Sequence, residues 1–237
     1  MVRTALVLET GGESQVCAVP SGGVRLGRGT DADVRLEGET VSRLHAAVRP
    51  DGDGYVVEHL SATNPTQVNE VAIDRTVRLV DGDRLRLGSA QLTFHDLSSG
   101  DRLSGPMCSH CGRENRPDDH DCWFCGTSLV NAPTNVLAKR EVSCRLVSAT
   151  GDTYDLLNGE HFAVAGDGGG VVQREGESEP GATTIARLDG EQPLTPDPSP
   201  EELRHNDVAA TPGRALASGD VLRWGDTTFV IITRADP

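Results

Sequence analysis

One stretch of the sequence occurs twice without a gap, and this repeat constrains the fold more than any other feature. NEVAIDRTVRLVDGDRLRLG begins at Asn69, and NDVAATPGRALASGDVLRWG begins at Asn206. The two copies share their first asparagine, a Gly-Asp pair and an alternation of apolar with polar residues. Shared turn residues in one register predict one hairpin geometry, so we expect two copies of the same β fold.

Short apolar runs, broken by turn pairs such as Asp51-Gly52, fill both ends of the chain and predict a mainly β protein. The 237 residues suffice for two small domains and a minor module. We expect a β-sandwich in residues 1–98, a cysteine module with flanking linkers in 99–138, and a second, diverged β-sandwich in 139–237. Within the last segment, acidic and proline-rich composition predicts a mobile loop at about 173–202.

The formal net charge of −14 excludes several classes of partner. Neither end of the chain is basic, which disfavours binding to nucleic acid or to anionic membranes. No apolar run approaches the ~18 residues of a membrane span, and the N-terminus lacks the apolar core of a signal peptide. We therefore expect a cytoplasmic protein.

Two cysteine pairs have the spacing of metal ligands, and they comprise Cys108, Cys111, Cys122 and Cys125. Paired thiolates in a reducing compartment favour a metal over disulfides. The glycine after each pair, Gly112 or Gly126, lets the backbone fold around the sulfurs. The spacing favours zinc over an iron site of rubredoxin type. Because four thiolates close a tetrahedral site, the zinc is expected to be structural, in a module that resembles a short zinc ribbon.

Other side chains of the cysteine module leave alternatives open. His110 and His120 are potential ligands, although the four cysteines make them unnecessary. Acidic residues outnumber the arginines of the module, which disfavours nucleic acid. Trp123 and Phe124 either pack against a neighbouring domain or anchor a protein partner, and we favour packing.

Polar side chains cluster at three strand ends of the first segment, and they comprise Arg28, Ser42, Arg43, Thr63 and Asn64. Loops from one end of a sandwich converge, so these hydrogen-bond donors should face a common point. If residues 41–45 form a strand, Ser42 and His45 point to opposite faces, which argues against a Ser-His nucleophile and against an enzyme. A phosphate dianion, with three acceptor oxygens, matches two arginines and neutral donors.

The same residues lie in four motifs: LGR at 26–28, SRLH at 42–45, TNPTQVN at 63–69 and DGDRLRLG at 81–88. Together these motifs resemble the forkhead-associated (FHA) domain, and the resemblance spans nearly all of residues 1–98. It implies an eleven-stranded β-sandwich that binds phosphothreonine peptides.

By this resemblance, Arg28 and Ser42 bind the phosphate directly, and Arg43 and Thr63 assist. Asn64 holds the main chain of the ligand.

The resemblance also implies structural roles. His45 braces the loop through hydrogen bonds, and Asn69 stabilises a turn. Pro65 and Glu70 stand where the family often has glycine, and the proline stiffens the loop that faces the ligand.

The second copy lacks most of these groups. VAGDGGG has no arginine, and aligning residues 183–189 with 39–45 places Ala186 over Ser42 and Asp189 over His45. The repeat spacing puts Glu201 in place of Asn64. We therefore expect a degenerate FHA-like sandwich that does not bind phosphopeptides.

Threonines in the expected acidic loop suggest an intramolecular ligand. Thr183 or Thr184, once phosphorylated, would reach the first sandwich at high effective concentration.

The sequence thus predicts a non-enzymatic adaptor in Ser/Thr kinase signalling that binds a phosphothreonine-containing kinase or kinase substrate. The alternative is a structural or nucleic-acid-linked interaction protein that uses the ribbon and the second sandwich and has a vestigial phosphate pocket.

Overall fold

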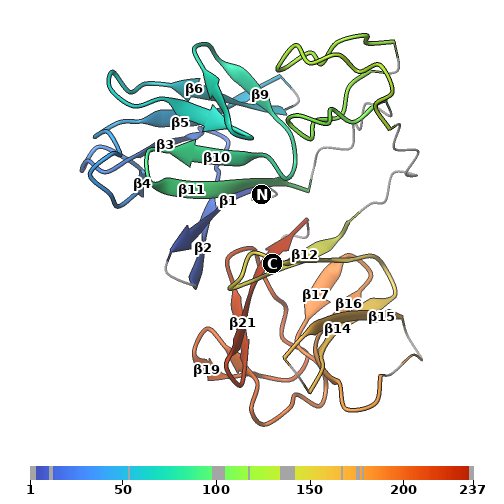
Figure 1. The fold of residues 1–237 in the computed structure, drawn as a ribbon. Coiled ribbons are helices and arrows are strands. Elements are labelled where there is room, and N and C mark those ends of the chain that lie inside the picture. The colour runs from blue at the N-terminus through green and yellow to red at the C-terminus, as the bar shows by residue number, and fades with distance from the viewer. Residues whose placement is uncertain are drawn as a thin grey trace. The chain divides into compact units, whose positions relative to one another are not determined.

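The computed structural model contains only β-strands and connecting segments among the residues that it describes (Figure 1). These residues are 4–10, 13–52, 54–97, 105–116, 118–133, 142–166, 168–174, 177 and 179–234. The mainly β fold class is therefore confirmed. Most of the two predicted linkers lies outside the described residues.

The chain divides into two units that are each compact. We call residues 21–94 with 99–140 the central unit, and residues 1–20, 95–98 and 141–237 the terminal unit. The three-part division expected from the sequence stays a prediction.

The central unit contains two sheets. One has the strand order β4-β3-β5-β6-β9, and the other contains β11-β10-β7-β8. The strands are β3 (Val24–Gly27), β4 (Val34–Arg35), β5 (Ala46–Asp51), β6 (Gly54–His59), β7 (Thr66–Val68), β8 (Val71–Ile73), β9 (Val77–Leu79), β10 (Arg84–Leu87) and β11 (Ala90–Asp96). The last two residues of β11 belong to the terminal unit.

Alternation along the strands creates the core of this first sandwich. In β10, Leu85 and Leu87 are buried, whereas Arg84 and Arg86, which alternate with them, are exposed. Side chains of the two sheets meet inside, as Tyr55 of β6 and Phe94 of β11 show with ring centroids 5.8 Å apart. Burial on one face and solvent on the other explains the period of two in the sequence.

The terminal unit holds a second sandwich and the first two strands of the chain. Its sheets have the orders β13-β12-β21-β20-β18-β19 and β15-β14-β16-β17. The strands are β1 (Thr4–Thr10), β2 (Glu13–Ala18), β12 (Cys144–Ser148), β13 (Thr153–Leu156), β14 (Glu160–Val164), β15 (Gly170–Arg174), β16 (Thr183–Asp189), β17 (Gln192–Leu194), β18 (Arg204–His205), β19 (Val208–Ala209), β20 (Val221–Trp224) and β21 (Thr227–Thr233).

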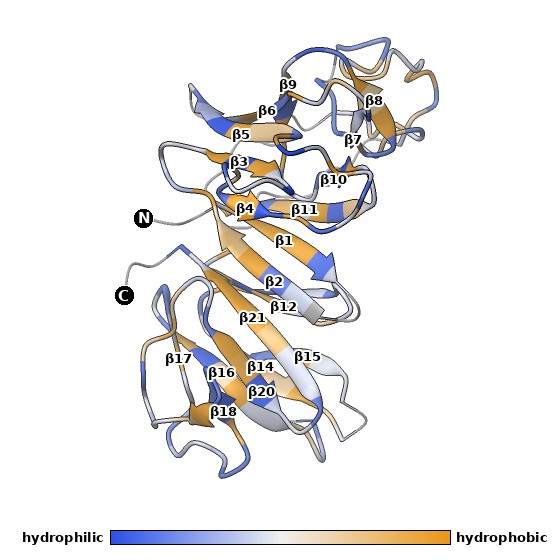
Figure 2. Cartoon of the chain, turned by 90° about the vertical axis from the view of Figure 1, so that its left-hand side faces the viewer, coloured by the Kyte–Doolittle hydropathy of each residue, from blue (hydrophilic) through white to orange (hydrophobic). Residues whose placement is uncertain are grey.

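Apolar strands form two clusters in the terminal unit, and hydrophobic colour dominates β1 and β21 (Figure 2). Residues from both sheets, among them Phe162 and Phe229, make the core of the second sandwich. A smaller cluster joins Val7 of β1 to Val147 of β12 and Ile232 of β21. The hairpin β1-β2 is thereby anchored within this unit.

The two sandwiches repeat the same strand order and the same corner. The order β21-β20-β18-β19 matches β11-β10-β7-β8 strand by strand. In the first copy, Asn69 Nδ2 donates to Asp83 Oδ1 at 2.7 Å, and in the second Asn206 Nδ2 donates to Asp220 Oδ1 at 2.8 Å. Both asparagines have positive φ, 48° and 50°. The structure thus repeats the corner at the spacing found in the sequence.

The prediction of a loop at about 173–202 is wrong for the central part of that range. Residues 183–189 form β16 and residues 192–194 form β17, because buried Ile185 and Ala186 pack in the core and Gly190 turns the chain with a φ of 61°.

The hairpin register also corrects the alignment of the second copy. Asp189 pairs with Gln192 as Asp51 pairs with Gly54, so β16 corresponds to β5 rather than to residues 39–45. Thr183 and Thr184 therefore lie in a paired strand, opposite Val164 and Ala163, instead of in a loop.

No helix in the described ranges is long and apolar enough to cross a membrane.

Asp220→Ala is expected to destabilise the second sandwich by about 1 kcal/mol, because an asparagine side chain and a partly buried backbone amide lose their acceptor. The carboxylate accepts hydrogen bonds from Asn206 Nδ2 and from the Ala217 amide. Urea unfolding of the whole chain measures the change, with the exposed Asp226→Ala as the control. Equal stability of the two variants would contradict the role of this corner.

Candidate functional site

Residues 41–45 form a loop before β5 rather than the expected strand. The end of β3 lies against this loop, since the Arg28 amide donates to Ser42 O and the Gly29 amide donates to Arg43 O, both at 3.0 Å. A Cβ on Gly27 would lie 2.2 Å from Arg43 O, so only glycine permits this approach. The backbone thereby brings Arg28 beside Ser42 and Arg43.

Three hydroxyl groups meet next to this contact. Ser42 Oγ lies 2.7 Å from Ser61 Oγ and 3.4 Å from Thr63 Oγ1. Ser61 Oγ also accepts hydrogen bonds from the amides of Thr63 and Asn64, at 3.3 and 3.2 Å. Ser61 was not among the predicted site residues, although serine hydroxyls in turns commonly bond to the backbone two residues on, as Ser61 Oγ does to the Thr63 amide.

The amide side chain of Asn64 borders a second part of the site. Asn64 Nδ2 donates to Thr40 O at 2.8 Å, and the same two residues line a surface hollow with Gln67, Arg86 and Ser89. The hollow is therefore polar and carries one guanidinium.

Arg28 and Arg43 are the two charged residues that are predicted to contact the phosphate. Both are exposed, and neither forms an ion pair within the described residues. The structure thus collects Arg28, Ser42, Arg43, Thr63 and Asn64 on one side of the first sandwich. Exposed guanidinium groups and neighbouring hydroxyls offer hydrogen bonds to an oxyanion.

His45 is fully buried and holds the loop on both sides. Its Nδ1 accepts from the Ser42 amide at 3.1 Å, and its Nε2 lies 3.4 Å from Pro65 O. Burial lowers the pKa of His45, the Pro65 carbonyl opposes this effect, and nearby His59 lowers the pKa further. The contacts suit a neutral imidazole that keeps its proton on Nε2.

Catalysis by Ser42 and His45 finds no support in this geometry. The imidazole contacts the backbone amide of Ser42, whereas the Ser42 hydroxyl contacts Ser61 and Thr63. A nucleophile needs its base within hydrogen-bond reach of the hydroxyl.

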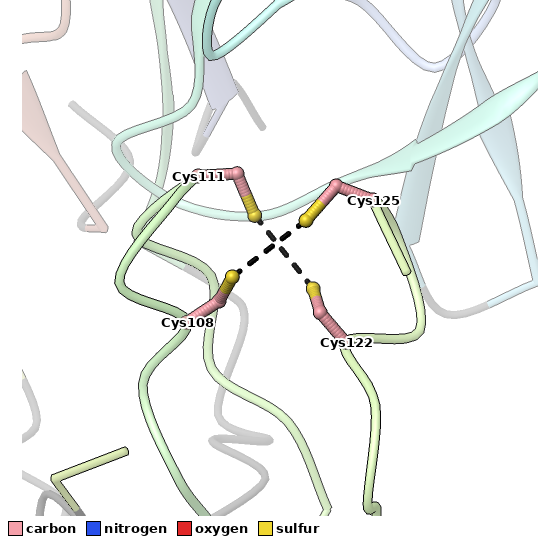
Figure 3. Close-up of side chains that lie close together, drawn as sticks. All are labelled: Cys108, Cys111, Cys122 and Cys125. Carbon is pink, nitrogen blue, oxygen red and sulfur yellow. Dashed lines mark hydrogen bonds between the residues drawn. The ribbon is translucent and has the colours of Figure 1, made fainter. Parts of the chain in front are cut away.

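The four paired cysteines of the central unit point to one centre (Figure 3). Their sulfur atoms all lie within 4.8 Å of one another, with Cys108–Cys125 at 3.6 Å and Cys111–Cys122 at 3.7 Å. A tetrahedral zinc with Zn–S bonds of about 2.3 Å separates its sulfurs by about 3.8 Å. The cluster therefore fits a metal of this size.

Two equivalent turns present the sulfurs. The Gly112 amide donates to Cys108 O and the Gly126 amide to Cys122 O, both at 2.9 Å, with φ of 70° and 73° at the glycines. Burial raises the pKa of Cys122, whereas at Cys125 hydrogen bonds with Thr127 and with other cysteines outweigh burial and lower the pKa to about 6. A thiolate is the form that a metal binds.

The cysteine module packs on the first sandwich through Arg113, which is 1% exposed. Its guanidinium pairs with Asp83 and lies over the rings of Trp123 and Phe124, 4.7 and 4.0 Å from their centroids. Burial raises the pKa of Asp83, and the charge of Arg113 opposes this effect. The two aromatic rings thus contact Arg113 of their own module, and Trp123 is 37% exposed, so their packing against a neighbouring domain stays a prediction.

We expect His45→Gln to reduce the loss of stability at acid pH. The folded pKa of His45 is lowered, so the unfolded state binds the proton first and stability falls as pH drops below about 6.5. Urea unfolding without ligand at pH 7.5 and about pH 5.5 measures this loss. The exposed His120→Gln is the control, and an undiminished loss in His45→Gln would refute the assignment.

The purified chain is expected to carry about one zinc, held by four thiolates. Elemental analysis should show that the Cys122→Ser protein lacks the metal. The Cys17→Ser protein should retain it, because Cys17 lies outside the cluster. Equal metal content in the two variants would show that the cluster is not the site.

Comparisons with known proteins match the segment of the chain that contains these residues. The family model "FHA domain" matches residues 24–88. Glycogen accumulation regulator GarA of Mycolicibacterium smegmatis is 35% identical over 86 residues, which are 36% of this chain and 49% of GarA. Transcriptional regulatory protein EmbR of Mycobacterium tuberculosis is 37% identical over 76 residues, which are 32% of this chain and 19% of EmbR.

A solved structure of Mycobacterium tuberculosis EmbR in complex with a low-affinity phosphopeptide is 29% identical, with a TM-score of 0.36, and the match covers 39% of this chain and 24% of that one. The chain thus spans less than half the length of these relatives. The sequence motifs and the family match together identify residues 24–88 as an FHA domain.

Proposed function

We propose that this protein is a non-enzymatic, cytoplasmic adaptor that binds phosphothreonine peptides in Ser/Thr kinase signalling. The observation that carries the proposal is the hydroxyl cluster of Ser42 and Thr63, 3.4 Å apart, beside the backbone contacts of Arg28 and Arg43. A phosphate carries about −1.5 to −2 charges and three acceptor oxygens, which this donor set can satisfy.

Each residue has a role in the proposal. Arg28 and Ser42 bind the phosphate, Arg43 and Thr63 assist, and Asn64 holds the ligand main chain. Preferred ligands are a kinase or a kinase substrate. The similarity of the matched region to EmbR and GarA, two regulators by name, supports a regulatory role.

The other parts of the chain support this binding domain. The four cysteines hold a structural zinc, which their sulfur spacing supports. The second sandwich is a degenerate FHA-like repeat that serves as a contact domain, since the strand order and the Asn-Asp corner recur, whereas Ala165 and Gly166 follow β14 where Arg28 follows β3.

The test is a titration of the whole chain with phosphothreonine, phosphoserine and unphosphorylated versions of a peptide library. Arg28→Ala should weaken phosphate-dependent binding about ten- to hundredfold, the effect of losing one or two charge-assisted hydrogen bonds. Arg49→Ala, an exposed arginine of β5 that pairs with Glu58, is the matched control and should bind normally. Equal affinity for phosphorylated and unphosphorylated peptides, or no binding at all, would refute the proposal and favour a vestigial pocket.

A further inference from the structure

The Asn69–Asp83 corner of the first sandwich connects β7 to β10. Besides Asn69, the Asp83 carboxylate accepts from the Val80 amide at 2.9 Å, and Asn69 Oδ1 accepts from the Arg84 amide at 2.9 Å. The carboxylate is 2% exposed. A buried carboxylate is costly unless a cation pairs with it, so the corner needs a counter-ion.

In the second sandwich, the equivalent carboxylate has a partner from the same sandwich. Asp220 faces His205, whose Nε2 lies 2.9 Å from Asp220 Oδ2, and His205 belongs to β18 of the same sandwich. At the equivalent register position the first sandwich has Val68, since Val68 pairs with Leu85 as His205 pairs with Leu222. The first sandwich therefore has no cation of its own at this position.

Arg113 of the cysteine module supplies the missing cation. It pairs with Asp83 and lies over the rings of Trp123 and Phe124, and its Nε and Nη1 have no hydrogen-bond partner within the described residues. Such a guanidinium is positioned by the fold of the module more than by its own hydrogen bonds. An apolar contact accompanies the ion pair, because Val71 of β8 packs against the module, whereas its counterpart Val208 is 59% exposed.

The position of Arg113 depends in turn on the cysteines. Arg113 O accepts from the Cys108 amide at 2.8 Å, so the arginine closes the first metal-binding turn. Buried cysteines are the main members of the module's small core, which otherwise contains Leu129. A unit with so little apolar core folds with its metal rather than without it.

We propose that the FHA domain of this chain is not autonomous: the metal-loaded cysteine module is an integral part of it, because Arg113 neutralises Asp83. Loss of the metal frees Arg113 and leaves a buried, unpaired carboxylate between β7 and β10. The disturbance reaches the ligand site through β7, which begins two residues after Asn64 and ends at Val68. The metal thereby controls the binding domain, and this last step alone rests on the proposed function.

Hydrogen exchange of the whole chain, before and after removal of zinc by a chelator under reducing conditions, tests the coupling. Exchange should accelerate at least tenfold in residues 66–73 and 80–87. The equivalent segments, 203–210 and 217–224, provide an internal control because His205 is retained, and their exchange should not change. No change in either pair of segments would overturn the proposal, and so would equal acceleration in both.

Arg113→Met and Asp83→Asn separate the ion pair from the metal itself. Arg113→Met should accelerate exchange at residues 66–73 while the protein still carries its zinc. In Asp83→Asn the neutral amide needs no cation, so hydrogen exchange at residues 66–73 should increase less when the chelator is added. If Arg113→Met behaves as the wild type, or if Asp83→Asn responds fully, the ion pair does not carry the coupling.

Binding of a phosphothreonine peptide to the same samples gives a second readout. Removal of zinc should weaken it at least tenfold. If the zinc-loaded protein binds no phosphopeptide, the proposed function fails while the exchange result still decides the coupling. If the peptide binds equally well with and without zinc, the coupling to the ligand site is wrong while the proposed function stands.

Discussion

An aspartate that accepts hydrogen bonds from an asparagine fastens one corner of each sandwich, and in the first sandwich this aspartate is buried and pairs with an arginine. Asp83 and Asp220 accept the same set of hydrogen bonds from an asparagine at positive φ and from a neighbouring backbone amide. The two copies then differ in the side chain that faces the carboxylate, which is Arg113 of the cysteine module in one and His205 in the other. The same corner geometry is therefore completed by two different side chains, and only the buried Asp83 requires a cation.

The oxyanion site depends on backbone approach more than on any single side chain. Gly27 lets β3 contact the loop that carries Ser42, and buried His45 fixes that loop from the inside. Ser61 then connects the loop to Thr63 and Asn64. Arg28 and Arg43 remain exposed, so the charge stays in water while neutral donors are held in place, which limits the desolvation cost of the site.

Parts of this arrangement could be predicted from sequence because they rest on local patterns. The cysteine spacing, the Asn and Gly-Asp repeat and the four motifs of the first segment each reflect turns of a few residues. The strands β16 and β17 were not predicted, because the apolar stretch around Ile185 is short and its flanking residues are acidic and rich in proline, which is typical of a loop. The wrong alignment of residues 183–189 with 39–45 followed a shared Arg-Leu pair and departed from the repeat spacing, which instead places Thr183 over Ala46, the first residue of β5.

The sequence by itself determined the mainly β class, the repeated corner and the grouping of four cysteines, because alternation and turn residues act over short distances. Only the tertiary structure decided that Ser61 joins the hydroxyl cluster, that Ser42 contacts His45 through its backbone amide, and that Arg113 pairs with Asp83. The physical reason is that a buried charge or hydroxyl is satisfied by whichever group folding brings within hydrogen-bond distance. Arg113 lies thirty residues beyond Asp83, and no local pattern links the two.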